Sequence, residues 1–302
     1  MEREKLYRLL RLGLEKGASD IHFQVDYLPL YRFHGELVEL RYKVLTPEDT
    51  EAIVRLLCEN EPDIDEGLDW NERDLAFELP GEGRFRVNIS RQRRNFNVVL
   101  RVIPPQIKTF GDLNLPAVLS DIAHARRGYV LVTGATGMGK STTLATMLNE
   151  INTSRKCKIV TVEDPIEFVF SHEKAIITQR EIGTDTASFP DALRAALRQD
   201  PDVIMVGEMR DLATVDTSLK AAETGHLVFS TIHTSDVAST INRLVSFFPT
   251  EEQLNVRARL AENLHAIVSL RLLVNKKENG RVPAVEIMRS TRSIQELSLI
   301  HI

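Results

Sequence analysis

Residues 129–141 read Tyr129-Val130-Leu131-Val132-Thr133-Gly134-Ala135-Thr136-Gly137-Met138-Gly139-Lys140-Ser141, an apolar run that passes directly into a glycine-rich loop. Residues 134–141 fit the pattern G-x-x-x-x-G-K-[ST], and residues 141–151 follow with helical character. In such a strand–loop–helix unit, backbone N–H groups and the positive end of the helix surround phosphate groups. The stretch therefore predicts an α/β domain with a nucleotide phosphate site; the alternative is a chance glycine-rich turn.

The residues predicted to bind the nucleotide are those of the loop and of the first helical turn: Gly134, Ala135, Thr136, Gly137, Met138, Gly139, Lys140, Ser141 and Thr142. The motif assigns Lys140 to the β- and γ-phosphates and the Ser141 hydroxyl to Mg²⁺. ATP and Mg²⁺ are the expected cofactors.

The rest of the chain predicts two domains. After the first run, apolar stretches at residues 159–162, 203–206 and 227–232 alternate with helical ones, which is typical of a parallel sheet buried on both faces. Further on, we expect a helix opened by a capping box at residues 250–253. Before Pro104-Pro105 the pattern is α+β, so we predict an N-terminal domain over residues 1–103, a linker over 104–110 and an ATPase domain over 111–302.

Composition excludes several classes of protein. The 302 residues carry 38 basic and 43 acidic side chains, a net charge of −5, which argues against a nucleic-acid partner. The apolar runs are far shorter than a membrane span requires, and two cysteines are too few for a disulfide framework or a four-cysteine zinc site. We therefore expect a soluble, cytoplasmic protein that meets a membrane only through partners.

Acidic residues follow two of the predicted strands. Glu163 and Asp164 come after residues 159–162, and Gly207-Glu208 comes after residues 203–206. The carboxyl ends of the strands line the ligand crevice of an open α/β sheet. We expect Glu208 and Glu163 to orient the attacking water and Asp164 to support Mg²⁺, with acids that merely end strands in solvent as the alternative. Gly207 stands where an aspartate is usual, so the division of roles stays open.

Two histidines bracket the run over residues 227–232. His226 and His233 face opposite sides on a strand of period two, so at most one faces the nucleotide. His233, at the carboxyl end, is the candidate to sense the γ-phosphate; an ordinary buried or capping histidine is the alternative for both.

Five ordered blocks resemble one family, the PilT-type ATPases, which are type IV pilus retraction motors of the type II/IV secretion ATPase superfamily. They are an N-domain signature, the Walker A loop, the Asp box, an atypical Walker B block with its glycine, and the His box: residues 18–22, 134–141, 162–167, 202–211 and 221–234. The resemblance implies a PAS-like N-domain, a RecA-like C-domain and a homohexameric ring that uses ATP to drive pilus disassembly and twitching motility. It also implies an inner-membrane platform protein as partner.

The alternatives within the superfamily are an export or assembly ATPase and an accessory retraction ATPase. The two cysteines and the early N-domain signature favour the retraction type. A nucleic-acid translocase and a non-enzymatic scaffold are further alternatives. At the C-terminal end, residues 293–296 replace a longer family segment, so we expect incomplete C-terminal helices and an artificial terminus at residues 297–302. ATP hydrolysis should survive the loss of this segment. The loss counts against retraction, because the segment is needed for it in the family.

An arginine-rich run lies in the N-terminal domain. Residues 84–101 hold six arginines and no acid, whereas residues 48–82 hold thirteen acids and two bases. Alternation places the guanidinium groups on the polar faces of two strands. We predict that Arg86 and Arg101, with Arg84 a weaker candidate, reach the γ-phosphate of a neighbouring subunit, because arginine can grip phosphate oxygens in two places. The alternative is surface arginines paired with the acidic run.

Overall fold

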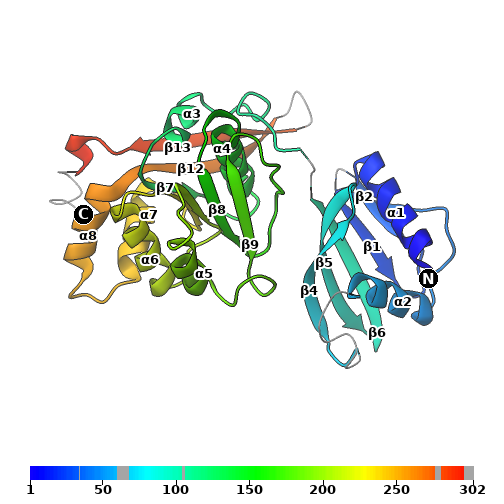
Figure 1. Cartoon of the computed structure of the whole chain (residues 1–302). Helices are drawn as coiled ribbons and strands as arrows, with labels where there is room; N and C mark the ends of the chain where they lie inside the picture. The colour runs from blue at the N-terminus through cyan, green and yellow to red at the C-terminus, as the bar shows by residue number, and fades with distance from the viewer. Residues whose placement is uncertain (34, 60–67, 104–105, 276–279, 296–302) are drawn as a thin grey trace. The chain divides into compact units, whose positions relative to one another are not determined.

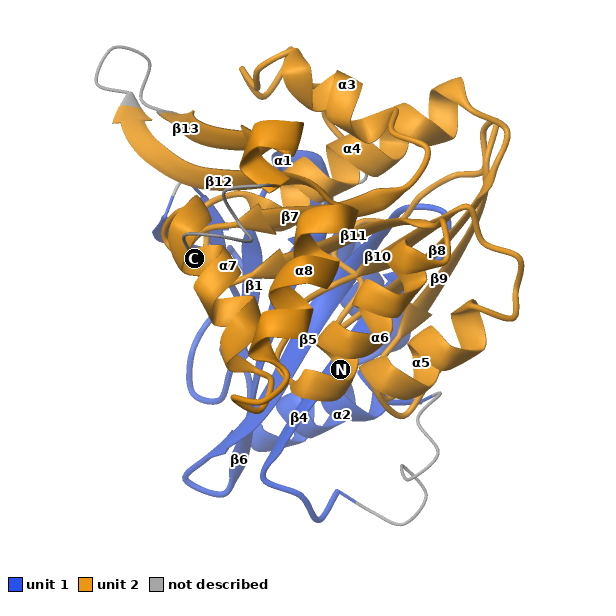
Figure 2. Cartoon of the chain, turned by 90° about the vertical axis from the view of Figure 1, so that its left-hand side faces the viewer, with its two compact units in different colours: residues 1–105 blue, residues 106–302 orange. Residues whose placement is uncertain are grey.

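The computed structural model describes residues 1–33, 35–59, 68–103, 106–275 and 280–295, and the chain forms two compact units, residues 1–105 and 106–302 (Figure 1). Figure 2 colours the two units separately. The predicted linker starts at residues 104–105, which lie outside the described residues, as do residues 296–302 at the predicted artificial terminus.

The first unit is the expected α+β domain. Its elements in chain order are α1 (Arg3–Lys16), β1 (Asp20–Gln24), β2 (Leu30–Phe33), β3 (Glu36–Glu39), α2 (Pro47–Leu57), β4 (Glu72–Leu79), β5 (Gly83–Gln92) and β6 (Asn95–Ile103). The strands form one antiparallel six-stranded sheet in the order β3-β2-β1-β6-β5-β4.

One face of this sheet holds the core of the unit. Leu6 and Leu10 of α1 and Ile53 of α2 pack with alternate strand residues such as Phe85 and Val98. Because side chains on a strand alternate between faces, the residues between these apolar positions lie on the other face of the sheet. At the start of helix α2, the Thr46 hydroxyl accepts the backbone N–H of Asp49 in a capping box.

The second unit is the expected α/β domain. Its elements are α3 (Val118–Ala123), β7 (Gly128–Thr133), α4 (Lys140–Ser154), β8 (Lys158–Glu163), β9 (Ile176–Glu181), α5 (Phe189–Ala196), β10 (Val203–Val206), α6 (Leu212–Glu223), β11 (Leu227–Ile232), α7 (Val237–Ser246), α8 (Gln253–Asn263), β12 (Leu264–Asn275) and β13 (Gly280–Arg289). The sheet order is β13-β12-β7-β11-β10-β8-β9, and β13 alone pairs antiparallel.

Helices cover both faces of this sheet, as the continuous apolar strands predict. Tyr129 and Leu131 of β7 pack in the cluster formed with α5, α6, α7 and α8, and these helices lie over the sheet in Figure 2. Val130 and Val132 pack in the cluster formed with α3 and α4. The phosphate loop therefore leaves the middle of a sheet that is fixed on both sides.

Two features differ from the sequence prediction. The predicted capping box at residues 250–253 is wrong: α8 begins at Gln253, after Glu252, without a side-chain capping bond. The Gln253 amide instead donates to the carbonyl of Phe248 at 3.1 Å. Strands β9, β12 and β13 were also not predicted. No helix in the described part of the chain combines the length and apolar character that a bilayer crossing requires.

Candidate nucleotide and catalytic site

The phosphate loop needs glycine where it passes the neighbouring strand. Gly134 has φ +140°, and a Cβ there would lie 2.6 Å from the carbonyl oxygen of Leu270 on β12. Any side chain at this position would therefore strain the loop backbone and collide with the Leu270 carbonyl. The loop is further tied to β12 by the backbone N–H of Leu272, which donates to the sulfur of Met138 at 3.3 Å. Helix α4 then starts at Lys140, so its N-terminus faces the loop.

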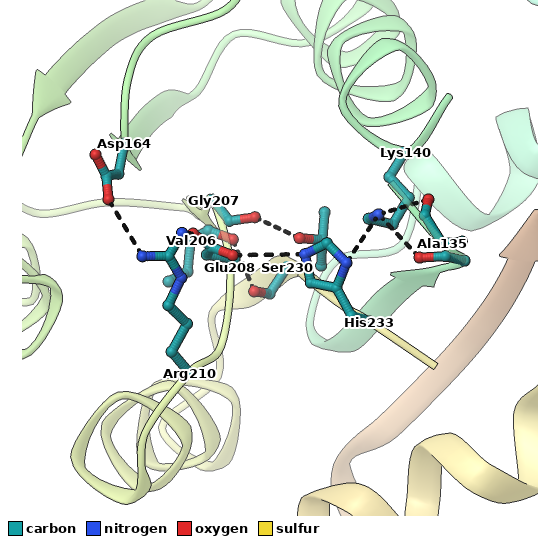
Figure 3. Close-up of polar contacts among 11 residues, drawn as sticks. Ala135, Lys140, Asp164, Val206, Gly207, Glu208, Arg210, Ser230 and His233 are labelled. Atoms are coloured by element: carbon teal, nitrogen blue, oxygen red, sulfur yellow. Dashed lines mark hydrogen bonds and ion pairs between the residues drawn. The ribbon is translucent and has the colours of Figure 1, made fainter. Parts of the chain in front are cut away.

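Lys140 points back into the loop. Its Nζ donates to the carbonyl oxygens of Gly134 at 2.9 Å and Ala135 at 3.0 Å (Figure 3). The side chain is buried, and this burial lowers the pKa of Lys140, against the opposing effect of the Glu167 and Glu208 carboxylates. A buried cation held mainly by carbonyl dipoles is favourably placed to accept an anion such as a phosphate.

Glu163 is the last residue of β8 and is buried. Its Oε1 accepts hydrogen bonds from the Thr161 hydroxyl at 2.7 Å and from the Gln179 amide at 3.1 Å. Burial raises the pKa of Glu163 to about 7, although the two hydrogen bonds act in the opposite direction. Such a carboxylate can take up a proton near neutral pH. Sequence reasoning missed Gln179, because β9 itself was not predicted.

Gly207 explains the departure from the usual Walker B pattern. Its N–H donates to the Val162 carbonyl at 2.8 Å, and a Cβ at this position would lie 3.3 Å from that carbonyl oxygen. An aspartate at residue 207 would therefore crowd β8 directly beside Glu163. The acid comes one residue later, at Glu208, whose side chain is 15% exposed and thus still largely sheltered from solvent.

Strand β11 fixes the turn that carries Glu208. The hydroxyl of Ser230 donates to the Val206 carbonyl at 2.7 Å, and the hydroxyl of Thr231 donates to the Gly207 carbonyl at 2.6 Å (Figure 3). These two bonds couple the end of β10 to the strand that precedes His233. Neither hydroxyl was predicted to matter, since serine and threonine within an apolar run give no distinct sequence signal.

The predicted His233 lies between the lysine and the carboxylate. Its Nδ1 is 3.5 Å from Lys140 Nζ, and its Nε2 is 3.6 Å from Glu208 Oε2 (Figure 3). His226 lies at the opposite end of β11, where its Nδ1 contacts the Ala221 carbonyl at 2.9 Å. The structure thus places His233 beside the phosphate loop and leaves His226 in a capping contact.

Arg210 joins two of the carboxylates at this edge of the sheet, those of Asp164 and Glu208. Its guanidinium forms an ion pair with Glu208 and lies 3.6 Å from Asp164 (Figure 3). Sequence reasoning did not single out Arg210, although it stands two residues after Glu208 in the same block. Glu208, Asp164, His233 and Lys140 are therefore brought together, whereas Glu163 is held by its own hydrogen bonds.

The donor atoms suit Mg²⁺. Ser141 is the second residue of α4, and the Glu208 carboxylate is linked to the loop through His233 and Lys140. The Asp164 carboxylate is joined to Glu208 through Arg210. Across the described residues, no three histidine, cysteine or acidic side chains gather into a metal site of their own. Mg²⁺ commonly binds through one or two protein oxygens together with nucleotide phosphates and waters, so these residues fit the ion.

The predicted arginines lie in the other unit. Arg86 on β5 and Arg101 on β6 stand directly opposite each other in the antiparallel register, and both side chains are exposed. Arg101 pairs with Asp20 at 3.0 Å rather than with the acidic run. Within the described residues, Arg86 has no ion pair, whereas Arg84 does have an interaction partner.

With the geometry established, the family can be assigned. The chain matches the model of the family described as "Type II/IV secretion system protein" over residues 4–297. The chain belongs to this family.

Its relatives within the type II/IV secretion system family include pilus proteins. The chain is 44% identical to the type IV pilus retraction ATPase PilT of Pseudomonas aeruginosa over 96% of its own length and 83% of that protein. It is 43% identical to a twitching motility protein of Neisseria gonorrhoeae, over 89% of its own length and 72% of that protein.

A solved structure is similar over the same range. The crystal structure of the pilus retraction motor PilT with bound ADP matches with a TM-score of 0.91 and 45% identity, covering 97% of this chain and 85% of that one. The similarity confirms the expected fold class, an α/β RecA-like domain after a smaller α+β domain. The present chain is therefore an ATPase that binds nucleotide.

Proposed function

We propose that this chain is the motor of type IV pilus retraction. It hydrolyses ATP in a homohexameric ring and uses the energy for pilus disassembly, and thereby for twitching motility. The proposal is supported by similarity over nearly the whole chain to proteins described as retraction ATPases and as a twitching motility protein.

The contact of His233 with both Lys140 and Glu208 carries the enzymatic part of the proposal. It joins the group that binds the terminal phosphates to the carboxylate that orients water, within one edge of the sheet. We therefore assign to His233 the role of contacting the γ-phosphate and sensing whether it is present. Ser141 and Asp164 would hold Mg²⁺, which would neutralise charge on the phosphate oxygens.

Glu208 and Glu163 have different parts in this reaction. Glu208 lies beside His233 and orients the attacking water. Glu163 is buried, which raises its pKa to about 7, and it takes up the proton that the water loses. Residues 134–142 hold the phosphates through the loop and the N-terminus of α4.

The exposed guanidinium groups of Arg86 and Arg101 act on the γ-phosphate held by a neighbouring subunit. An arginine supplied in trans stabilises the charge that develops on the transferred phosphoryl group. This assignment makes hydrolysis depend on assembly of the ring.

The ring works at the cytoplasmic face of the inner membrane. Its partners are an inner-membrane platform protein and the pilus machinery, and it meets the membrane through them. It takes no nucleic acid, in keeping with the net charge of −5.

The test is complementation of a piliated strain that lacks its own retraction motor. Expression of this chain should restore pilus retraction and twitching, and Lys140→Ala should restore neither. Restoration of pilus assembly instead would identify an assembly ATPase. Restoration only beside a resident motor would identify an accessory ATPase, and DNA-stimulated hydrolysis would identify a translocase.

A further inference from the structure

A single row of charged residues crosses the N-terminal sheet from strand to strand. The registers of β5, β6, β1 and β2 place Arg86 opposite Arg101, Arg101 opposite Asp20, and Asp20 opposite Arg32. Their chain neighbours, such as Phe85 and Leu100, are buried in the core on the other face. The row therefore lies on the face that α1 and α2 do not cover, and Asp20 is its one acid.

Asp20 is fixed on both of its oxygens. Oδ1 accepts the Nε–H of Arg101 at 3.0 Å, and Oδ2 accepts the Ser19 hydroxyl at 2.9 Å. Arg32 Nε lies 3.9 Å from Oδ2. The Asp20 side chain is 10% exposed, whereas that of Arg101 is 70% exposed. A sheltered, immobile carboxylate thus holds the base of an otherwise exposed guanidinium.

The contact with Asp20 leaves the Nη groups of Arg101 available to bind a ligand. A guanidinium has five N–H donors, and the bond to Asp20 uses the single one on Nε. In the described residues, neither Nη group of Arg101 has a further partner. Two arginines directly opposite each other repel, and the Asp20 carboxylate offsets that repulsion on the side away from Arg86.

We propose that Asp20 is a positioning residue that holds Arg101 beside Arg86, so that the two guanidinium groups can bind one phosphate group together. The proposal rests on the arginine role assigned under the proposed function. Asp20 acts through Arg101 and not on the phosphate group itself.

A double-mutant cycle on the full-length protein tests this role, with ATP hydrolysis measured as phosphate release. Asp20→Ala should lower kcat by about tenfold, because Arg101 loses the charge-assisted hydrogen bond that fixes its guanidinium and only part of that bond's strength reaches the reaction. KM for ATP should stay within about threefold, because an arginine that acts on the developing charge affects kcat. The variant combined with Arg101→Ala should be no slower than Arg101→Ala alone.

Matched variants keep the outcomes distinct. Asp74→Ala removes an exposed acid from the same face, bonded to Asn88 at 3.1 Å, and should leave kcat within about twofold. Asp20→Asn keeps the shape without the charge and replaces Asp20→Ala in the cycle if that variant fails to fold. Independent, multiplicative losses from Asp20 and Arg101 would overturn the proposal, as would wild-type kcat in the Asp20 variants. Wild-type activity of Arg101→Ala itself would instead contradict the arginine role.

Discussion

The Nζ atom of Lys140 lies 3.5 Å from Nδ1 of His233, so the first helical residue after the phosphate loop meets the first residue after strand β11. The other contacts of the lysine are the loop carbonyls of Gly134 and Ala135. Phosphate oxygens are stronger acceptors for an ammonium group than neutral carbonyls. Nucleotide binding is therefore expected to draw the lysine out of its own loop and to bring His233 into contact with the γ-phosphate.

Lys140→Ala should abolish ATP hydrolysis and weaken ATP binding, because it removes the buried ammonium group that the phosphate loop directs at the phosphates. Phosphate release and equilibrium binding of a fluorescent ATP analogue measure the two effects. Lys156→Ala, an exposed lysine of the same unit, serves as the control and should behave as wild type. Hydrolysis near the wild-type rate in Lys140→Ala would contradict the phosphate-loop assignment.

Glu208→Gln should keep ATP binding and slow hydrolysis by about 10²–10⁴-fold, because the amide keeps the shape of the side chain and loses the carboxylate. Glu163→Gln should also slow hydrolysis, and by less if Glu208 has the principal role. Single-turnover phosphate release compares the two directly. If Glu163→Gln proves the slower variant, the water-orienting role belongs to Glu163.

Much of this site could be predicted because phosphate binding requires particular residues close together in the sequence. The loop over residues 134–141, the acids at the ends of β8 and β10, and His233 all depend on a motif or on a strand end. The helix and strand bounds around them followed closely from apolar patterning, as for β10 and β11.

The contribution of Glu163 to stability should depend on pH. Burial raises the pKa of Glu163 to about 7 in the folded chain, from an ordinary value of 4.5 when unfolded. Between these values the folded state binds more protons, so the stabilisation is present at low pH and is lost as pH rises through about 7. Denaturant unfolding of the nucleotide-free, metal-free protein should show a loss of about 2 kcal/mol from pH 5 to 8 that Glu163→Gln lacks. Glu173→Gln, at an exposed position, should keep the wild-type profile.

Thr231→Val tests the coupling between β10 and β11. Valine has nearly the same shape as threonine, but it leaves the Gly207 carbonyl without its 2.6 Å hydrogen bond. We expect a loss of about 1–3 kcal/mol in the free energy of unfolding and a lower kcat with little change in ATP binding. Thr224→Val loses an exposed bond to the Lys220 carbonyl at the far end of β11 and is the matched control. Unchanged kcat in Thr231→Val would show that the bond does not position Glu208.

Other parts of the site depend on contacts between distant segments, which local patterns do not reveal. Gln179 reaches Glu163 from β9, a strand whose polar residues hide its periodicity. Strand β12 follows α8 without a turn signal, so the strand that forces glycine at residue 134 was not predicted. The pairing of Arg101 with Asp20 joins residues 81 positions apart and depends on strand register, which the sequence leaves open.

The trans role of the arginines can be decided by mixing subunits. Arg101→Ala subunits keep an intact phosphate loop, and Lys140→Ala subunits keep intact arginines. In a mixed ring, some intact loops stand beside intact arginines, so mixing should recover ATP hydrolysis that pure Lys140→Ala rings lack and that pure Arg101→Ala rings retain only at a low rate. An arginine supplied in trans contributes about 10³–10⁵-fold in the known GTPase examples, so even partial recovery is measurable. Arg84→Ala subunits, mixed in the same way, separate the weaker candidate from Arg101. Verified mixed rings without recovery would leave Arg101 as a surface charge held by Asp20 or as a contact within its own subunit.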